Sequence, residues 1–241
     1  MIRIEQNEQC CGCEACVQVC PKSCISFDSD AEGFRYPLVD EDRCINCELC
    51  EKVCPVIHQS EERKPQAIYA AKNPNEDIRR DSSSGGIFTM LAEEIIRQGG
   101  VVFGARWNER WEVVHDYVET SEELALFRGS KYVQSRIGDN YTKVRTFLRE
   151  GRQVLFSGTP CQVAGLKRFL RKEYENLLTV DFICHGVPSP GVWERYKDEL
   201  LNSKATPPHL QQVSIKSINF RNKAKGWKRF SLEFLFKRKE K

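Results

Sequence analysis

The chain has no long apolar run and no strong excess of charge of either sign. No stretch reaches the ~18 consecutive apolar residues of a membrane-spanning helix, and the N-terminus, MIRIEQNEQC, lacks the apolar core of a signal peptide. With 37 basic and 34 acidic residues, the formal net charge of +3 does not indicate a nucleic-acid partner. We therefore expect a cytoplasmic protein without a membrane span, whose thiols are reduced and serve metal binding or catalysis.

Common signatures of nucleotide binding and nucleophilic catalysis are also missing. The chain contains neither a G-x-G-x-x-G motif nor a Walker loop, and nothing marks a catalytic triad. Cys161 with the nearby His185 is conceivable as a nucleophile and base, but no third group is apparent. The catalytic residues therefore remain unknown at the level of sequence.

Cysteine is abundant, and ten of the twelve cysteines lie in the first 54 residues. The pattern C-x2-C-x2-C-x3-C-P occurs twice, 34 residues apart, beginning at Cys10 and at Cys44. In this motif three thiolates bind one 4Fe-4S cluster and the fourth reaches the other cluster. We assign the first cluster to Cys10, Cys13, Cys16 and Cys54, and the second to Cys44, Cys47, Cys50 and Cys20.

Two alternatives concern this cysteine array. Paired C-x2-C units also bind zinc, but zinc takes four ligands and has no use for a third cysteine repeated in each motif. The remaining cysteines, Cys11 and Cys24, are expected to pack around the clusters as small apolar residues. Residues 1–58 resemble a bacterial two-cluster ferredoxin, which implies an α+β domain with a short hairpin near Gly33.

Residues 59–66, QSEERKPQ, are polar and form a predicted linker to a second domain, residues 67–241. There strand and helix patterns alternate, which predicts an α/β domain with a mixed, mostly parallel sheet. Strands are predicted at 66–72, 101–107, 112–119, 153–157, 177–183 and near 230–236, and helices at 84–100, 121–127, 141–151, 161–170 and 190–203.

Cys161 and Cys184 each follow a predicted strand directly. If these strands are parallel neighbours, both sulfurs emerge at the carboxyl edge of the sheet, where ligands gather in open α/β folds. Cys161 also opens a helix, a position that favours a thiolate and predicts a reactive cysteine. Two structural cysteines in the core are an equally good interpretation from these residues alone.

Two further segments are candidates for binding an anion. The turn at Ser84, Gly85 and Gly86 precedes a helix and offers backbone N–H groups, although simple capping of that helix explains it as well. Lys131 lies between a Gly-Ser turn and an apolar strand, where a surface lysine is the ordinary expectation.

The cysteine array together with SSSGGIFTML, GSKYVQS, SGTPCQVAGLKRFL and FICHGVPSPGVW resembles the coenzyme F420 hydrogenase and dehydrogenase beta subunits, bacterial branch. The resemblance implies an iron–sulfur flavoprotein that relays electrons between 4Fe-4S clusters and FAD. The flavin would reduce or oxidise a two-electron carrier such as coenzyme F420. The residues then expected near FAD are Ser84, Gly85, Gly86, Lys131, Gly158, Thr159 and Pro160.

The resemblance also implies that Cys161 and Cys184 join a later C-x2-C pair in a third 4Fe-4S cluster. No C-x2-C follows Cys184, so we expect a chain shortened at its C-terminus, without a stable third cluster. The expected partner is an electron-carrying protein, a partner subunit or a small redox carrier. Assembly of several copies of the chain is also compatible with the sequence. The alternative function is a ferredoxin-type electron-transfer module whose α/β part is a docking scaffold without a flavin.

Overall fold

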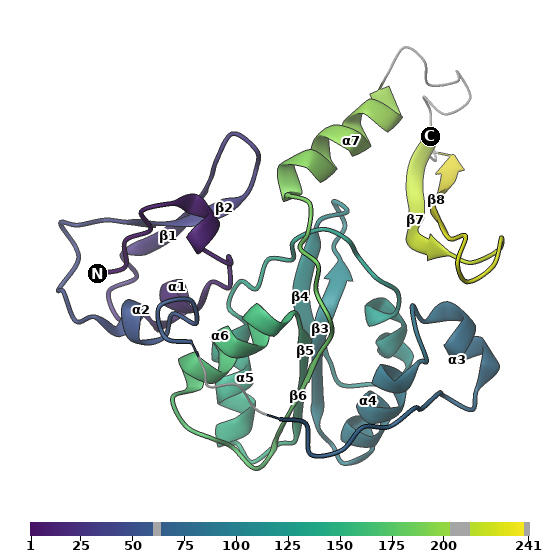
Figure 1. The fold of residues 1–241 in the computed structure, drawn as a ribbon, viewed down its shortest axis with the longest axis horizontal. Coiled ribbons are helices and arrows are strands. Elements are labelled where there is room, and N and C mark those ends of the chain that lie inside the picture. The colour runs from purple at the N-terminus through teal and green to yellow at the C-terminus, as the bar shows by residue number, and fades with distance from the viewer. Residues whose placement is uncertain (60–63, 203–212, 239–241) are drawn as a thin grey trace.

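A small cysteine-rich domain packs beside a larger α/β domain (Figure 1). The computed structural model describes residues 1–59, 64–202 and 213–238. Part of the predicted linker, 60–63, and parts of the predicted second domain, 203–212 and 239–241, lie outside the described residues. No helix of the described chain combines the length and the apolar character needed to cross a bilayer.

The cysteine-rich domain is built around one hairpin and two short helices. Strand β1 (Ile25–Ser29) pairs antiparallel with β2 (Arg35–Val39), and Gly33 turns the chain between them with a φ of +84°. Because φ is positive at that turn, a residue without a Cβ is favoured there. The 3-10 helix η1 (Asn7–Gln9) precedes the first cysteine, and helices α1 (Ala15–Val19) and α2 (Leu49–Lys52) follow the two cysteine loops.

The α/β domain contains a four-stranded sheet in the order β4-β3-β5-β6. Strands β3 (Val101–Trp107), β5 (Val154–Gly158) and β6 (Leu177–Asp181) are parallel, whereas β4 (Val113–Val118) runs antiparallel beside β3. The predicted mixed, mostly parallel sheet is therefore confirmed.

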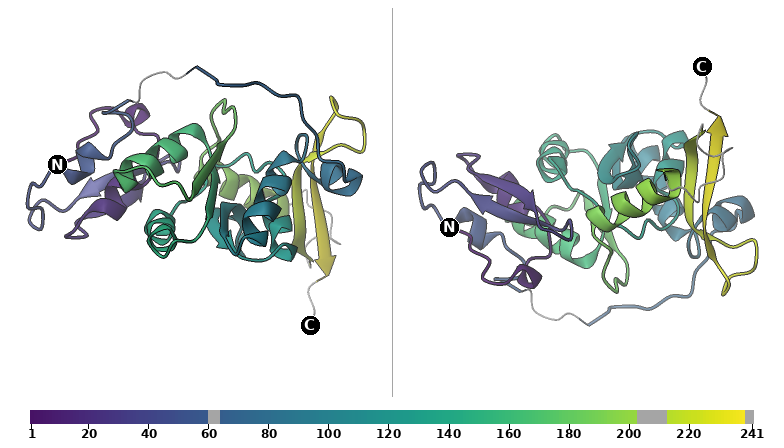
Figure 2. Two further views of the ribbon diagram at one scale, coloured as in Figure 1. Left: turned by 90° about the horizontal axis from the view of Figure 1, so that it is seen from below. Right: turned by 90° about the horizontal axis from the view of Figure 1, so that it is seen from above.

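Helices cover both faces of this sheet, as the two views in Figure 2 show. On one face α5 (Asn140–Arg149) and α6 (Pro160–Leu170) enclose an apolar cluster with the central strands. On the other face α4 (Ile87–Arg97) and the 3-10 helix η2 (Glu122–Phe127) pack against alternate residues of the same strands. Because both faces are buried, β3 and β5 begin as continuous apolar runs.

The C-terminal part forms a separate hairpin. Strand β7 (Val213–Asn222) pairs antiparallel with β8 (Ser231–Arg238), so the predicted apolar strand near the C-terminus has its partner. The indole of Trp193, in α7 (Pro190–Asn202), stacks on Phe234 and lies against Trp107 at the end of β3. This aromatic cluster attaches the hairpin to the rest of the domain.

One predicted strand is wrong. Residues 66–72, QAIYAAK, have the alternation of a strand, yet they form no strand in the structure. They belong to the irregular segment that precedes α3 (Glu76–Asp81). Ile68 and Tyr69 are 87% and 85% exposed, so no neighbouring surface covers their side chains. A strand needs a hydrogen-bonded partner, and none of the described strands pairs with this segment.

Candidate functional site

Eight of the N-terminal cysteines line two hollows, four in each. The first hollow is lined by Cys10, Cys13, Cys16 and Cys54. The second hollow is lined by Cys20, Cys44, Cys47 and Cys50. Each hollow thus takes three cysteines from one repeat and one from the other, which is the grouping that the spacing predicts.

Backbone turns of positive φ bend each cysteine loop around its hollow. Gly12 has a φ of +63°, and Glu14 and Glu48, which precede α1 and α2, both have a φ of 60°. Backbone N–H groups also point at sulfur, from Gly12 to Cys10 Sγ at 3.4 Å and from Ile2 to Cys50 Sγ at 3.2 Å. Such bonds stabilise negative charge on a ligating thiolate.

The hollows suit a cluster better than a single ion. Zinc holds its sulfur ligands at about 2.3 Å, which requires the side chains to converge on one point. Within the described ranges, no three Cys, His, Asp or Glu side chains form such a single-ion group. The four sulfurs that line each hollow instead supply the number of thiolate donors that a 4Fe-4S cluster takes.

Each hollow also contains a fifth cysteine. Cys24 lines the second hollow, and its sulfur lies 3.4 Å from that of Cys20. Cys11 lines the first hollow and its thiol contacts the thiols of Cys13 and Cys161. The thiol of Cys13 and burial raise the pKa of Cys11 to about 12. Cys11 and Cys24 therefore pack directly beside the predicted ligands.

The first hollow lies against the α/β domain. Gly165 of α6 approaches Cys13 so closely that a Cβ on Gly165 would lie 3.0 Å from Cys13 Sγ and 3.0 Å from the hydroxyl of Tyr141. Tyr141 is fully buried and its hydroxyl donates to the carbonyl of Gln162 at 2.8 Å. Cys47 of the second hollow, in contrast, is exposed. The two hollows thus differ in what surrounds them.

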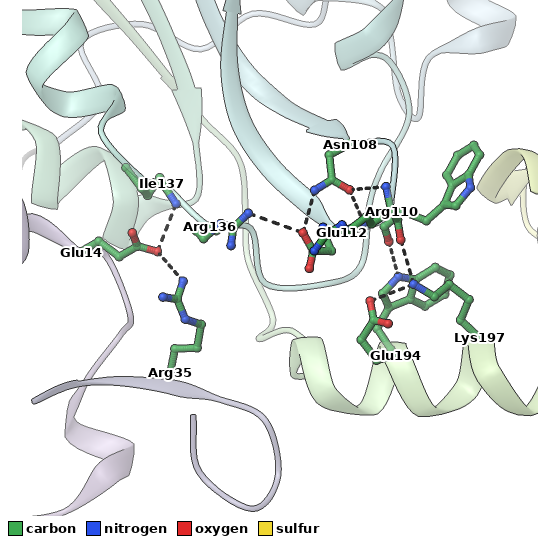
Figure 3. A network of polar contacts seen from close by, with 11 residues as sticks. Glu14, Arg35, Asn108, Arg110, Glu112, Arg136, Ile137, Glu194 and Lys197 are labelled. Carbon is green, nitrogen blue, oxygen red and sulfur yellow. Dashed lines mark hydrogen bonds and ion pairs between the residues drawn. The ribbon is translucent and has the colours of Figure 1, made fainter. Parts of the chain in front are cut away.

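Glu14 holds the first cysteine loop to the α/β domain (Figure 3). Its carboxylate accepts hydrogen bonds from the backbone N–H groups of Ile137 at 3.3 Å and Gly138 at 2.9 Å, and Arg35 lies 3.5 Å away. Burial raises the pKa of the Glu14 carboxyl, and these partners offset that only in part. One turn further along α1, Gln18 accepts the N–H of Thr142 at 3.1 Å.

The polar network continues from this interface across the α/β domain. Arg136 donates to Glu112 at 3.5 Å, and Glu112 accepts from Asn108 at 2.7 Å (Figure 3). Beyond the turn, Lys197 of α7 donates to the carbonyl of Arg110 at 2.8 Å and pairs with Glu194. The loop after β3 is thereby fixed to α7.

A second contact joins the tip of the β1–β2 hairpin to the start of α7. A Cβ on Gly191 would lie 2.8 Å from the Cα of Gly33 and 3.0 Å from the carbonyl oxygen of Glu32. Ser189 donates to that same carbonyl, and Arg195 donates to the carbonyl of Ala31 at 3.1 Å. The cysteine-rich domain is therefore attached at two separate places.

Cys161 and Cys184 follow neighbouring parallel strands, β5 and β6, at the same edge of the sheet. Cys161 Sγ, however, contacts the hydroxyl of Thr159 at 3.0 Å and the thiol of Cys11, whereas Cys184 is exposed. The Cys11 thiol and burial raise the pKa of Cys161, which opposes the reactive thiolate that its place at the start of a helix predicts. The helix N-terminus stabilises a thiolate, but this effect is smaller than the cost of placing a charge on a poorly solvated sulfur.

The segments expected near a flavin form two groups. Ser83 accepts hydrogen bonds from the N–H and the hydroxyl of Ser130, at 2.6 and 2.7 Å, which joins the Ser84-Gly85-Gly86 turn to the segment that carries Lys131. Gly86 precedes α4 with a φ of +76°, and no side chain caps that helix. The turn Gly158-Thr159-Pro160 lies at the end of β5 and starts α6.

Lys131 is already bound within its own loop. Its ammonium donates to the carbonyls of Phe127, Arg128 and Gly129 at 3.4, 3.3 and 3.2 Å. Burial lowers the pKa of Lys131 to about 8. These three acceptors account for the three N–H groups of an ammonium, so a direct hydrogen bond to a ligand would require the side chain to move.

A buried polar chain fixes the turn that carries Cys161. Nε2 of His115 lies 3.1 Å from the carbonyl of Ser157, which only accepts, so this nitrogen carries the proton. Nδ1 then accepts from the hydroxyl of Ser135 at 3.0 Å, and that hydroxyl accepts from Gln162 at 2.8 Å. Gln162 in turn accepts the N–H of Thr159 at 3.0 Å. Burial lowers the pKa of His115 to about 4, which keeps it neutral.

Sequence reasoning missed the residues that join the two domains. Glu14, Gly165 and Gly191 lie within the motifs described above, but no motif indicates their role, because their partners lie far along the chain. The one available signal was the second repeat, which has Glu48 in the position of Glu14. A charged residue kept in both loops could have indicated a role beside the cysteines.

Three family matches cover most of the chain. The 4Fe-4S dicluster domain family matches residues 9–57. The coenzyme F420 hydrogenase/dehydrogenase beta subunit family matches residues 68–139 with its N-terminal part and residues 151–238 with its C-terminal part. No curated protein matches.

Among solved structures, a similar chain comes from a study of the F420-reducing [NiFe] hydrogenase complex from Methanosarcina barkeri. It shares 18% identity with a TM-score of 0.45, over 62% of this chain and 53% of that chain. This chain thus spans about half the length of that relative.

Proposed function

Since this chain belongs to the coenzyme F420 hydrogenase/dehydrogenase beta subunit family and carries a 4Fe-4S dicluster domain, we propose that it is an iron–sulfur oxidoreductase subunit. It relays electrons between the two cysteine-lined hollows and a flavin held by the α/β domain. The carrier at the far end is a two-electron acceptor or donor of the coenzyme F420 class. We place the protein in the cytoplasm.

The observation that carries this proposal is the position of the first hollow between the second hollow and the α/β domain. Cys13 of the first hollow touches α6 at Gly165, whereas Cys47 of the second hollow is exposed. The proposed path therefore runs from a partner subunit or redox carrier at Cys47, through the second and first hollows, to the carboxyl edge of the sheet. Clusters bound there would supply one-electron transfers, and a bound flavin would combine two of them.

The chain's own residues have defined tasks in this scheme. The eight cysteines of the two hollows hold the clusters, and N–H groups such as those of Gly12 and Ile2 stabilise charge on the sulfurs. The FAD phosphates are proposed to lie at the N–H groups of Gly85 and Gly86, where α4 begins without a side-chain cap.

The positive groups beside that turn support an anion there. Arg128 donates to Thr89 in the first turn of α4 at 3.4 Å, and Lys223 from the β7–β8 hairpin donates to the carbonyl of Ser82 at 2.6 Å. Lys131 contributes charge and shapes its loop through the three carbonyls that it binds. The Gly158-Thr159-Pro160 turn is proposed as the second flavin-contacting segment.

The proposal is tested by cofactor analysis of anaerobically prepared protein. We expect about eight iron and about eight sulfide per chain, and an acid-released flavin that chromatography identifies as FAD. Loss of FAD in a variant that lacks the Lys131 ammonium, Lys131→Met, with unchanged iron would support the assignment of the flavin site. Full iron with no flavin, even after incubation with FAD, would favour the alternative of an electron-transfer module with a docking scaffold.

A further inference from the structure

The two cysteine loops carry the same glutamate in the same backbone conformation. Glu14 lies between Cys13 and Cys16, and Glu48 lies between Cys47 and Cys50. Glu14 has φ 60° and ψ 10°, and Glu48 has φ 60° and ψ 6°. As each residue precedes the short helix of its loop, the two carboxylates start from equivalent positions.

Their surroundings differ in burial and in hydrogen bonding. The side chain of Glu14 is 10% exposed, accepts hydrogen bonds from the N–H groups of Ile137 and Gly138 and pairs with Arg35 at 3.5 Å. The side chain of Glu48 is 62% exposed and pairs only loosely with Lys52, at 3.7 Å. The α/β domain therefore takes up one of two equivalent glutamates and leaves the other in solvent.

This difference has two physical consequences. Hydrogen bonds to a buried carboxylate are charge-assisted and strong, so Glu14 fixes the loop between Cys13 and Cys16 to the segment before α5. A charge in a poorly solvated site also acts on its neighbours with little screening, whereas solvent and salt weaken the field of Glu48. Glu14 lines the first hollow and Glu48 lines the second, so each carboxylate lies beside the predicted ligands of its own repeat. What differs is burial, and with it the screening of the charge.

We propose that Glu14 is a positioning residue through which the α/β domain sets the geometry and the reduction potential of the first cluster alone. This inference rests on the proposed 4Fe-4S clusters and deepens that function. It gives the first cluster, beside the α/β domain, a reduction potential that differs from that of the second. Docking, and not the cysteine motif, distinguishes the two. Glu48 serves as the matched control within the same chain.

The test compares Glu14→Gln and Glu14→Ala with Glu48→Gln and Glu48→Ala in the cluster-loaded full chain. Potentiometric titration followed by electron paramagnetic resonance gives the potential of each cluster. Removal of the buried negative charge in Glu14→Gln should shift one cluster to a higher potential, since added electrons are then less repelled. The same change at Glu48 should shift neither cluster by a comparable amount.

Amide hydrogen exchange provides an independent readout of docking. In Glu14→Ala the amides of Ile137 and Gly138 should exchange roughly tenfold faster or more, because each loses a charge-assisted bond. Glu14→Gln retains an acceptor oxygen and should protect these amides better than Glu14→Ala. Glu48→Ala should leave the exchange at both positions unchanged.

Equal potential shifts in the Glu14 and Glu48 variants, or no shift in either, would overturn the inference. So would unchanged exchange at Ile137 and Gly138 in Glu14→Ala. Iron and sulfide analysis of the unmodified protein separates this failure from failure of the proposed function. A chain that binds no clusters refutes the function, whereas a chain with both clusters and indistinguishable variants refutes only the role of Glu14.

Discussion

Gly165→Ala tests the contact between α6 and the first cysteine loop. A glycine inside a helix is ordinarily improved by alanine, and the expected gain is about 0.8–1 kcal/mol. Here the new Cβ would lie 3.0 Å from Cys13 Cβ, Cys13 Sγ and the Tyr141 hydroxyl. Carbon contacts are normally about 3.5–4.0 Å, so two side chains, those of Cys13 and Tyr141, have to move.

The neighbours cannot move freely. Tyr141 is fully buried and its hydroxyl is held by the carbonyl of Gln162, and Cys13 belongs to the loop around the first hollow. Overpacking of this kind costs about 1–3 kcal/mol, which exceeds the gain in helix propensity. We expect a net loss of about 1 kcal/mol and an altered resonance signal of the first cluster, with the second cluster unchanged.

Urea unfolding and electron paramagnetic resonance of the cluster-loaded protein measure these two effects. Lys167→Ala is the control, because Lys167 is exposed on the same helix and makes no contact with the first hollow. If Gly165→Ala stabilised the protein by the propensity gain and left the spectrum of the first cluster unchanged, the close contact would not constrain this interface.

Three further predictions concern other parts of the structure. Because Cys24 lies 3.4 Å from Cys20, the double variant Cys20→Ala/Cys24→Ala should lower iron from about eight to about four per chain, with the cluster of the Cys44 repeat lost in the spectrum. The Cys20→Ala variant alone, with Cys24 still present, is its comparison. His115→Gln should flatten the pH dependence of unfolding. The pKa of His115 is lowered to about 4, so the folded protein should lose up to ~3 kcal/mol as pH falls from about 6.5 to about 4, and an unchanged slope would refute this. Gly191→Ala should accelerate amide exchange at the β1–β2 tip, with Val192→Ala, an exposed neighbour, as the control.

Features that depend on local spacing were predictable from the sequence. The grouping of Cys20 with the Cys44 repeat follows from a three-residue spacing that carries the fourth thiol away from its own loop. The parallel strands β3, β5 and β6 follow from apolar runs separated by helical patterns. In both cases a short stretch of chain contains the information.

Features that depend on packing between distant segments were not predictable. The alternation in QAIYAAK favours a strand, but the availability of a partner decides whether one forms, and the segment remains exposed. Cys161 and Cys184 share a sheet edge as predicted, yet the contact of Cys161 with Cys11 depends on how the cysteine-rich domain docks. That docking is determined by residues such as Gly165, whose importance appears only when its neighbour is known.

The duplicated cysteine motif has a consequence for docking specificity. A domain with an internal twofold repeat offers two similar faces, and either could in principle meet the same surface. The residues that differ between the repeats break this symmetry. Asn46 stands where the first repeat has Gly12, whose site leaves only 2.5 Å between an added Cβ and the Gln134 amide. Lys52 stands where the first repeat has Gln18, which accepts a backbone N–H at the start of α5. A lysine there could accept nothing and would meet the positive end of the helix. The second repeat cannot make these two contacts. This difference determines the orientation in which the pseudo-symmetric domain docks.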